Sequence, residues 1–302
     1  MGRNFWYNGE VNTSRTEWRF MMRINDSCAE CLFDKQQHLT GNQEYLDRVK
    51  EIIDNRDEND TSPYLVYLFT KEYEKRFGKK ASYKEIKKQY NDLVLSMESS
   101  VRDKIENATA PLLESLAYAR VGNYIDFGAM NSVDENTFLS LFDEAGIHER
   151  DKATVDSFVE QCAGAKSFLL ITDNCGEIVL DKLFLEQLKK RFSSLEINVM
   201  VRGGEVLNDA TEEDATYVGI DKIAKIISNG NSIAGTVYEM LPGQAKEILN
   251  GADVILAKGQ GNYETLSKQG RHIFYSFLCK CDLFTNRFNV PKLTGIFVEE
   301  LE

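Results

Sequence analysis

Residues 168–185 read FLLITDNCGEIVLDKLFL. Within them a strand-like apolar run changes to a helix-like amphipathic stretch, and this change indicates the fold. An apolar run at 168–171 ends at Asp173 and Asn174, and Gly176 and Glu177 then open an amphipathic stretch. This order is typical of the strand–turn–helix units that build a parallel sheet. The alternation continues through apolar runs at 197–201, 226–227, 254–257 and 273–278. The sequence therefore predicts an α/β fold with a Rossmann-like parallel sheet.

The part of the chain before residue 160 has a different periodicity. Its apolar residues recur at helical spacing, with charged residues between them. Helices are predicted near 28–39, 43–55, 63–77, 83–105 and 111–121. Ser27 with Glu30, and Thr211 with Asp214, have the spacing of helix caps, and Gly78 is expected to end the third helix. The predicted organisation is an N-terminal arm at 1–25, a separate all-helical lobe at 26–160 and an α/β domain at 161–302.

The composition excludes several classes of protein. The chain has 302 residues and a formal net charge of -12, which argues against binding to nucleic-acid phosphates, because these need a basic surface. It contains no run of the roughly 18 apolar residues that a membrane span requires. The first 23 residues lack the apolar centre of a secretory signal. We therefore expect a cytoplasmic protein without a nucleic-acid or membrane partner, whose oligomeric state is open.

Polar clusters follow three of the predicted strands at the point where each strand ends. They occupy residues 173–177, 202–209 and 258–262. Taken alone, each cluster is more often a cap or a turn. Because open α/β sheets bind ligands at the carboxyl ends of their strands, the three clusters are expected to meet in one site. Their carboxylate and amide oxygens, without His or Cys, favour Mg²⁺ or Mn²⁺ over zinc and are typical of phosphoryl transfer.

These motifs resemble those of the damage-control phosphatases, also catalogued as domain of unknown function 89. The similarity covers about residues 26–290 in unbroken order and rests on Asp173-Asn174-x-Gly176-Glu177, Arg202-Gly203 leading to Asn208-Asp209-Ala210-Thr211, Lys258-Gly259-Gln260-Gly261-Asn262, the run GNYIDF at 122–127, and Cys28-Ala29-Glu30-Cys31. The cysteine pair indicates the prokaryote-type branch. Glu205 stands where the family usually has proline, and Cys175 where a small residue is common.

The resemblance implies a helical lobe packed on a Rossmann-like domain, with a divalent metal held by Asp173, Asn174 and Asp209. That metal would be Mg²⁺ or Mn²⁺, with Co²⁺ or Ni²⁺ as alternatives in vitro. The positions expected to contact the substrate or its phosphate are Lys258, Asn262, Arg202, Asn123 and Asp126. Such proteins hydrolyse phosphate esters of sugars, phosphopantetheine or related small metabolites, often damaged or surplus ones, and a carboxyl methyltransferase activity has been attributed to relatives.

The catalytic set expected from these residues is Asp173, Asp209 and Glu177. Water is expected to attack the phosphate in line, with Glu177 or Asp209 accepting its proton, or Asp173 itself is the nucleophile. Glu177 is explained equally well as a first-turn residue favoured by the helix dipole. Two other classes stay open, a non-catalytic protein that binds a phosphometabolite or nucleotide, and a carboxyl methyltransferase. The residues after the first strand fit the glycine-rich turn of a methyltransferase poorly.

The six cysteines are expected to be reduced, because no secretory signal accompanies them. Cys28 and Cys31 lie one turn apart near a predicted helix start, and Cys279 and Cys281 lie two apart in an apolar stretch. A structural zinc site formed by these four thiols is one interpretation. Packing of reduced cysteines is favoured, because residues 274–284 are strongly apolar.

Overall fold

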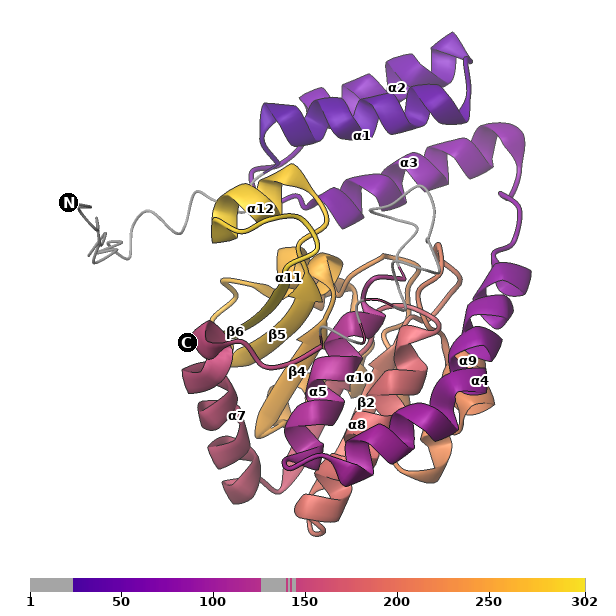
Figure 1. The fold of residues 1–302 in the computed structure, drawn as a ribbon. Helices are drawn as coiled ribbons and strands as arrows, with labels where there is room; N and C mark the ends of the chain where they lie inside the picture. The colour runs from indigo at the N-terminus through magenta and orange to yellow at the C-terminus, as the bar shows by residue number, and fades with distance from the viewer. Residues whose placement is uncertain (1–23, 126–139, 141, 143–144, 302) are drawn as a thin grey trace, which may run out of the picture.

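The computed structural model describes residues 24–125, 140, 142 and 145–301. Helices fill the first half of the described chain, and strands alternate with helices in the second half (Figure 1). The helices before the first strand are α1 (Asp26–Leu39), α2 (Gln43–Asp54), α3 (Ser62–Phe77), α4 (Lys84–Asn107), α5 (Pro111–Gly122), the 3₁₀ helix η2 (Glu149–Asp151) and α7 (Lys152–Gly164). Apart from its last two residues, the predicted arm lies outside the described residues.

Six strands of the described chain form one sheet in the order β3-β2-β1-β4-β5-β6. The strands are β1 (Ser167–Ile171), β2 (Glu196–Val201), β3 (Lys225–Ser228), β4 (Val254–Lys258), β5 (Ile273–Leu278) and β6 (Gly295–Glu300). Neighbouring strands run parallel, except that β5 and β6 are antiparallel. The predicted α/β fold and parallel sheet are confirmed. Strand β6 was not predicted, and its outer three residues are only partly buried at the sheet edge.

The helices that accompany the strands are α8 (Glu177–Arg191), α9 (Glu212–Val218), η3 (Ile220–Lys222), η4 (Tyr238–Met240), α10 (Gly243–Gly251), α11 (Gln260–Leu266) and α12 (Asp282–Phe288). The chain runs outward from β1 to β2 and β3, and then returns to place β4 on the other side of β1. The loops after β1 and β4 therefore leave the sheet at the point where the strand order reverses. In open α/β sheets this point forms the ligand-binding crevice.

Successive strand residues point into two separate cores, one on each face of the sheet. Phe168 and Leu170 of β1 face a core shared with α5, α7 and α8, whereas Leu169 and Ile171 face a core shared with α10, α11 and α12. Both faces are therefore covered by helices. Strands covered on both faces are apolar at nearly every position, which is why they were recognisable as short apolar runs.

The helical half of the chain divides between two cores. Helices α1 to α3 enclose a small core of their own, which includes Tyr45, Val49 and Phe69. By contrast, Val94 of α4 and Phe158 of α7 belong to the core on the sheet. In Figure 1, α1 and α2 lie above α3, and α4 and α5 run beside α8. The domain boundary near residue 160 remains a prediction.

The helix caps confirm two expectations and correct one. Gly78 ends α3 with a φ of 81°, and Thr211 and Asp214 form the capping box of α9. The capping box expected at Ser27 is wrong, because the side chain of Asn25 accepts a hydrogen bond from the Cys28 amide at 2.8 Å and α1 begins at Asp26. Asn is as good an N-cap as Ser, so the earlier residue starts the helix. No helix among the described residues is long and apolar enough to cross a membrane.

Candidate active site

Backbone pairing brings the segments after β1 and β2 together. The amide of Cys175 donates to the carbonyl of Asn208 at 2.8 Å, and the amide of Ala210 donates to the carbonyl of Asp173, also at 2.8 Å. These bonds flank an antiparallel bridge between Asn174 and Asp209. The three residues predicted to hold a metal therefore lie on two adjoining segments.

Arg202 links the two carboxylates of this predicted metal set. Its Nε donates to Oδ2 of Asp209 at 2.7 Å, and its Nη2 lies 3.5 Å from Oδ1 of Asp173. The Arg202 side chain is completely buried. An arginine fork fits paired carboxylates better than a flexible lysine does. In this structure Arg202, predicted to contact substrate, contacts both candidate metal ligands.

Two asparagine amides converge on Asp173 and Glu177. Nδ2 of Asn174 donates to Oδ2 of Asp173 at 2.8 Å and to Oε2 of Glu177 at 3.0 Å. Nδ2 of Asn123 donates to the same two oxygens at 2.9 and 3.0 Å. Because an ionised carboxylate can only accept, the NH₂ group of each asparagine must face these acids. The carbonyl oxygen of Asn174 therefore does not face these two oxygens.

Lys258, which was predicted to contact the substrate phosphate, is buried within the protein. Its completely buried Nζ is 2.9 Å from the carbonyl of Ala119, 2.6 Å from Oδ1 of Asp181 and 2.8 Å from Oε1 of Glu177. The contacts with Ala119 and Asp181 are hydrogen bonds, and the contact with Glu177 is an ion pair. Burial opposes the charge on Lys258, but Asp181 and Glu177 raise its pKa above the usual value. Burial raises the pKa of Asp181 to about 7, against the lowering effect of Lys258.

Asn262 makes four hydrogen bonds, which connect the segments after β1, β2 and β3 to the end of β4. Its Nδ2 donates to the carbonyls of Thr172 and Lys258, at 3.0 and 2.7 Å. Its Oδ1 accepts from Nη1 of Arg202 at 3.1 Å and from the hydroxyl of Thr236 at 2.9 Å. Asn262, Lys258 and Arg202 thus come together with the carboxylates as expected, but their polar atoms face protein partners. Contact of these three residues with phosphate stays a prediction.

Three site features were missed or misplaced from the sequence. Gly259 has a φ of +82°, and a β-carbon there would lie 2.0 Å from Oδ2 of Asp173, so only glycine lets the turn after β4 pass this carboxylate. Asp181 was missed, although it lies one turn after Glu177 and follows the three apolar residues 178–180, which was a visible signal. At the start of α8 the Gly176 amide donates to Oδ1 of Asn91 at 2.7 Å, a contact with α4 that the sequence did not predict. Asp126 lies outside the described residues.

The charges of the cluster fit a divalent cation. Four buried carboxylates, those of Asp173, Glu177, Asp181 and Asp209, surround the two buried cations Arg202 and Lys258. The excess of negative charge is costly to bury without compensation. Among the described residues no three His, Cys, Asp or Glu side chains converge on one point, so the Asn174 amide is needed to complete an all-oxygen set with Asp173 and Asp209. Hard cations such as Mg²⁺ and Mn²⁺ prefer such ligands.

The structure gives no support to the zinc interpretation of the four cysteines. Within the part of the chain that the structure describes, no three Cys, His or acidic side chains form a metal-binding group. Cys279 is buried in the core on the α10–α12 side of the sheet, whereas Cys31 and Cys281 are exposed. Burial raises the pKa of Cys28 to about 11, with Glu264 and Cys281 adding to the effect. The favoured interpretation as packing cysteines fits Cys279, which is buried, but not Cys31 and Cys281.

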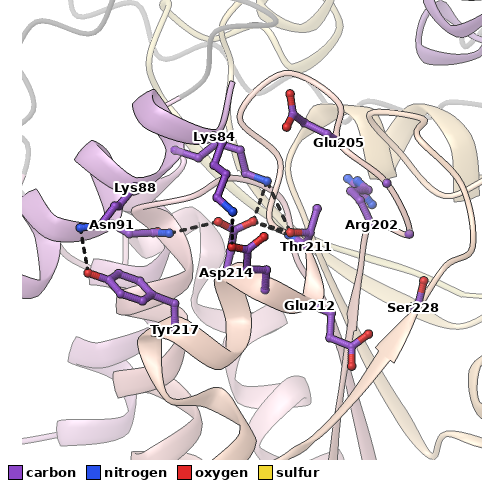
Figure 2. Close-up of a pocket in the computed structure, with 14 residues that line it drawn as sticks. Lys84, Lys88, Asn91, Arg202, Glu205, Thr211, Glu212, Asp214, Tyr217 and Ser228 are labelled. Carbon is purple, nitrogen blue, oxygen red and sulfur yellow. Dashed lines mark hydrogen bonds and ion pairs between the residues drawn. The ribbon is translucent and has the colours of Figure 1, made fainter. Parts of the chain in front are cut away.

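A cavity of about 570 Å³ lies beside this cluster, between α4, the loop after β2 and α9 (Figure 2). Arg202 lines the cavity and also holds the two carboxylates. Glu205, which replaces the usual proline, accepts from the hydroxyl of Ser82 at 2.7 Å and from the amide of Tyr83 at 2.6 Å. Hydrogen bonds therefore join the loop after β2 to the residues that directly precede α4.

Comparisons with known proteins extend over most of the chain. A family model described as the damage-control phosphatase ARMT1-like domain matches residues 19–294. A damage-control phosphatase of Archaeoglobus fulgidus is 28% identical over 273 residues, which are 86% of this chain and 93% of that protein. A damage-control phosphatase of Pyrococcus horikoshii is 35% identical over 178 residues, 58% of this chain. This second alignment spans 60% of the relative's own length.

A solved structure agrees with these matches. The crystal structure of a DUF89 family protein from Pyrococcus horikoshii superimposes with a TM-score of 0.72 at 27% identity. The superposition covers 90% of this chain and 97% of that one. The family model and the solved structure therefore each span both the helical half and the sheet. The chain belongs to the damage-control phosphatase ARMT1-like domain family.

Proposed function

We propose that this protein is a divalent-metal-dependent phosphatase that hydrolyses phosphate monoesters of small metabolites. The observation that carries the proposal is the arrangement of Asp173, Asn174 and Asp209 on two paired segments, in which Arg202 contacts both carboxylates. Relatives of similar sequence are named damage-control phosphatases. The proposal extends their activity to this chain.

We assign Asp173, Asn174 and Asp209 as the metal ligands. A divalent ion bound there would offset the charge of the phosphate and lower the pKa of an attacking water. Glu177 is fully buried, with Oε1 on Lys258 and Oε2 accepting from Asn123 and Asn174. We therefore assign Glu177 to positioning, and Asp209 to accepting the proton of the water. Asp173 as nucleophile is the alternative route.

The cavity beside the cluster supports a small polar substrate. Its volume of about 570 Å³ lies in the range of pockets that hold small molecules. Its walls carry ion pairs and hydroxyl groups, for example Lys84 with Glu213 and Lys88 with the hydroxyl of Tyr217. Such a lining suits ligands rich in hydroxyl or amide groups, and we propose sugar phosphates and phosphopantetheine-like esters. A cytoplasmic location and the lack of a nucleic-acid partner stay predictions.

The test is a substrate screen with controlled metals. The protein is stripped with a chelator, and Mg²⁺, Mn²⁺, Co²⁺ or Ni²⁺ is added back with p-nitrophenyl phosphate, sugar phosphates, phosphopantetheine or nucleotides. We expect phosphate release with at least one metal and none with the chelator alone. Binding of these compounds without hydrolysis under any metal would replace the proposal with a non-catalytic binding protein, and methyl transfer to carboxylates would favour the methyltransferase.

A further inference from the structure

The candidate metal site is connected to a buried acid that the expected catalytic set does not contain. Asp181 lies one helical turn after Glu177 on α8, so both carboxylates project from the same face of the helix. We propose that Asp181 is a positioning residue for the reaction centre, acting through Lys258 and Glu177 on the orientation of Asn174 and Asp173. This inference rests on the function proposed above.

The first step of the connection is the ion pair between Asp181 and Lys258. Oδ1 of Asp181 lies 2.6 Å from Nζ of Lys258, and both side chains are essentially inaccessible to water. The carbonyl of Ala119 takes a second N–H at 2.9 Å. These two acceptors hold the ammonium group within 2.8 Å of Oε1 of Glu177, with which it forms an ion pair. Asp181 thus helps to fix the position at which Lys258 meets Glu177.

The second step runs from Glu177 to the candidate ligands. With Oε1 on Lys258, Oε2 of Glu177 accepts from the side-chain amides of Asn123 and Asn174, each at 3.0 Å. The same amides donate to Oδ2 of Asp173, at 2.9 and 2.8 Å. A shift of Glu177 would therefore rotate the Asn174 amide, and Oδ2 of Asp173 would lose the hydrogen bond from Asn174.

This arrangement gives Lys258 a different role from a phosphate contact. Two hydrogen bonds and an ion pair already hold its Nζ, so reaching a phosphate would break a contact within the buried cluster. The carboxylate of Asp181 compensates the lysine charge together with Glu177. Groups that orient metal ligands typically contribute 10- to 100-fold, roughly, to metal affinity or activity. Loss of Asp181 should accordingly weaken metal binding and leave substrate binding unchanged.

The test measures metal binding directly as well as turnover. Mn²⁺ is titrated into the chelator-stripped protein at pH 8, above the Asp181 pKa of about 7, and free Mn²⁺ is followed by electron paramagnetic resonance. Asp181→Ala is expected to bind Mn²⁺ at least about 10-fold more weakly than wild type, with an unchanged KM for substrate. Asp181→Asn, which restores an acceptor for Lys258 without the charge, is expected to recover part of the affinity.

Asp151→Ala is the matched control. Asp151 forms an ion pair of 2.7 Å with Arg120, and this pair is nearly as buried as that of Asp181 and Lys258. It makes none of the contacts described between Asp181 and Asp173. We expect Asp151→Ala to lower stability while leaving Mn²⁺ affinity unchanged, which separates a general loss of stability from a loss of positioning.

Each outcome decides a separate question. Wild-type Mn²⁺ affinity in folded Asp181→Ala, or a rise in substrate KM without a change in Mn²⁺ affinity, would overturn the positioning role. If circular dichroism shows that Asp181→Ala does not fold, Asp181→Asn decides, and wild-type affinity in that variant overturns the role. A wild-type protein that binds no Mn²⁺ and hydrolyses no phosphate ester contradicts the proposed function itself.

Discussion

Arg202 donates from Nε to Oδ2 of Asp209 over 2.7 Å, and the two side chains are 0% and 4% exposed. The same guanidinium faces Asp173, so removing it leaves two buried carboxylates without this cation. Breaking one partner of a buried pair typically costs about 3–5 kcal/mol, because the remaining charge stays desolvated. The stability of the site segments therefore depends on Arg202 in the absence of metal.

We expect Arg202→Ala to lower the free energy of unfolding by about 3–5 kcal/mol in the presence of a chelator, measured by urea denaturation. Arg102→Ala is the control, because Arg102 pairs with Glu98 and Glu186 while its side chain is 32% exposed. Partly exposed pairs contribute about 0–1 kcal/mol, so the control should change little. Equal losses in the two variants would show that burial does not govern the strength of the Arg202 pairs.

Gly259→Ala tests the close approach between the turn after β4 and Asp173. The new β-carbon would meet the carboxylate at 2.0 Å, in a backbone conformation with a φ of +82° that alanine rarely adopts. Displacing a reacting group by about 1 Å can cost about 100-fold in rate, and we expect a loss of metal-dependent turnover of that order. Gly243→Ala is the control, since a β-carbon at Gly243 meets nothing within 4 Å. Turnover that survives in Gly259→Ala would rule out a catalytic role for Asp173 in its present position.

Glu264 connects the α1–α3 core to the sheet and should make stability depend on pH. Burial raises its pKa from 4.5 to about 7, although the side chain and amide of Ser62, at the start of α3, hydrogen-bond to it and act in the opposite direction. Between these values the folded chain binds more protons at this site than the unfolded chain, so folding stability should fall as pH rises from about 4.5 to about 7. Above that window the contribution should be constant.

Glu264→Gln removes this titration and serves as the comparison. The stability of wild type relative to Glu264→Gln, measured by urea denaturation at a series of pH values, should decline across the same window. A difference that stays flat or grows with pH would contradict the assigned direction of the Glu264 pKa.

The sequence predicted which segments lie together at the candidate site, but it did not predict the contacts within it. Three polar clusters follow strands β1, β2 and β4, which are neighbours in the sheet. Because ligands bind at the carboxyl ends of such strands, the proximity of the three clusters could be predicted. Strand β6 was not predicted, because only its first half is buried. It joins the edge of the sheet in antiparallel orientation.

The direction of each polar side chain was not predictable in the same way. Lys258 ends a strand, where a phosphate contact is a reasonable expectation. Its actual partners are Ala119 on α5 and two acids on α8, and these become neighbours only when the helices pack on the sheet. Asn262 and Arg202 likewise find each other across the ends of β4 and β2. Sequence spacing contains no information on such contacts, because they depend on tertiary packing.

The central claim is that Asp209 belongs to a divalent-metal site that hydrolyses phosphate esters. The most direct measurement compares turnover of p-nitrophenyl phosphate by wild type and Asp209→Asn at saturating Mn²⁺ and at saturating Mg²⁺. Asparagine keeps the size of the side chain but removes its negative charge, and we expect kcat to fall by at least about 100-fold while the protein stays folded. Full wild-type turnover by a folded Asp209→Asn at saturating metal would contradict the site.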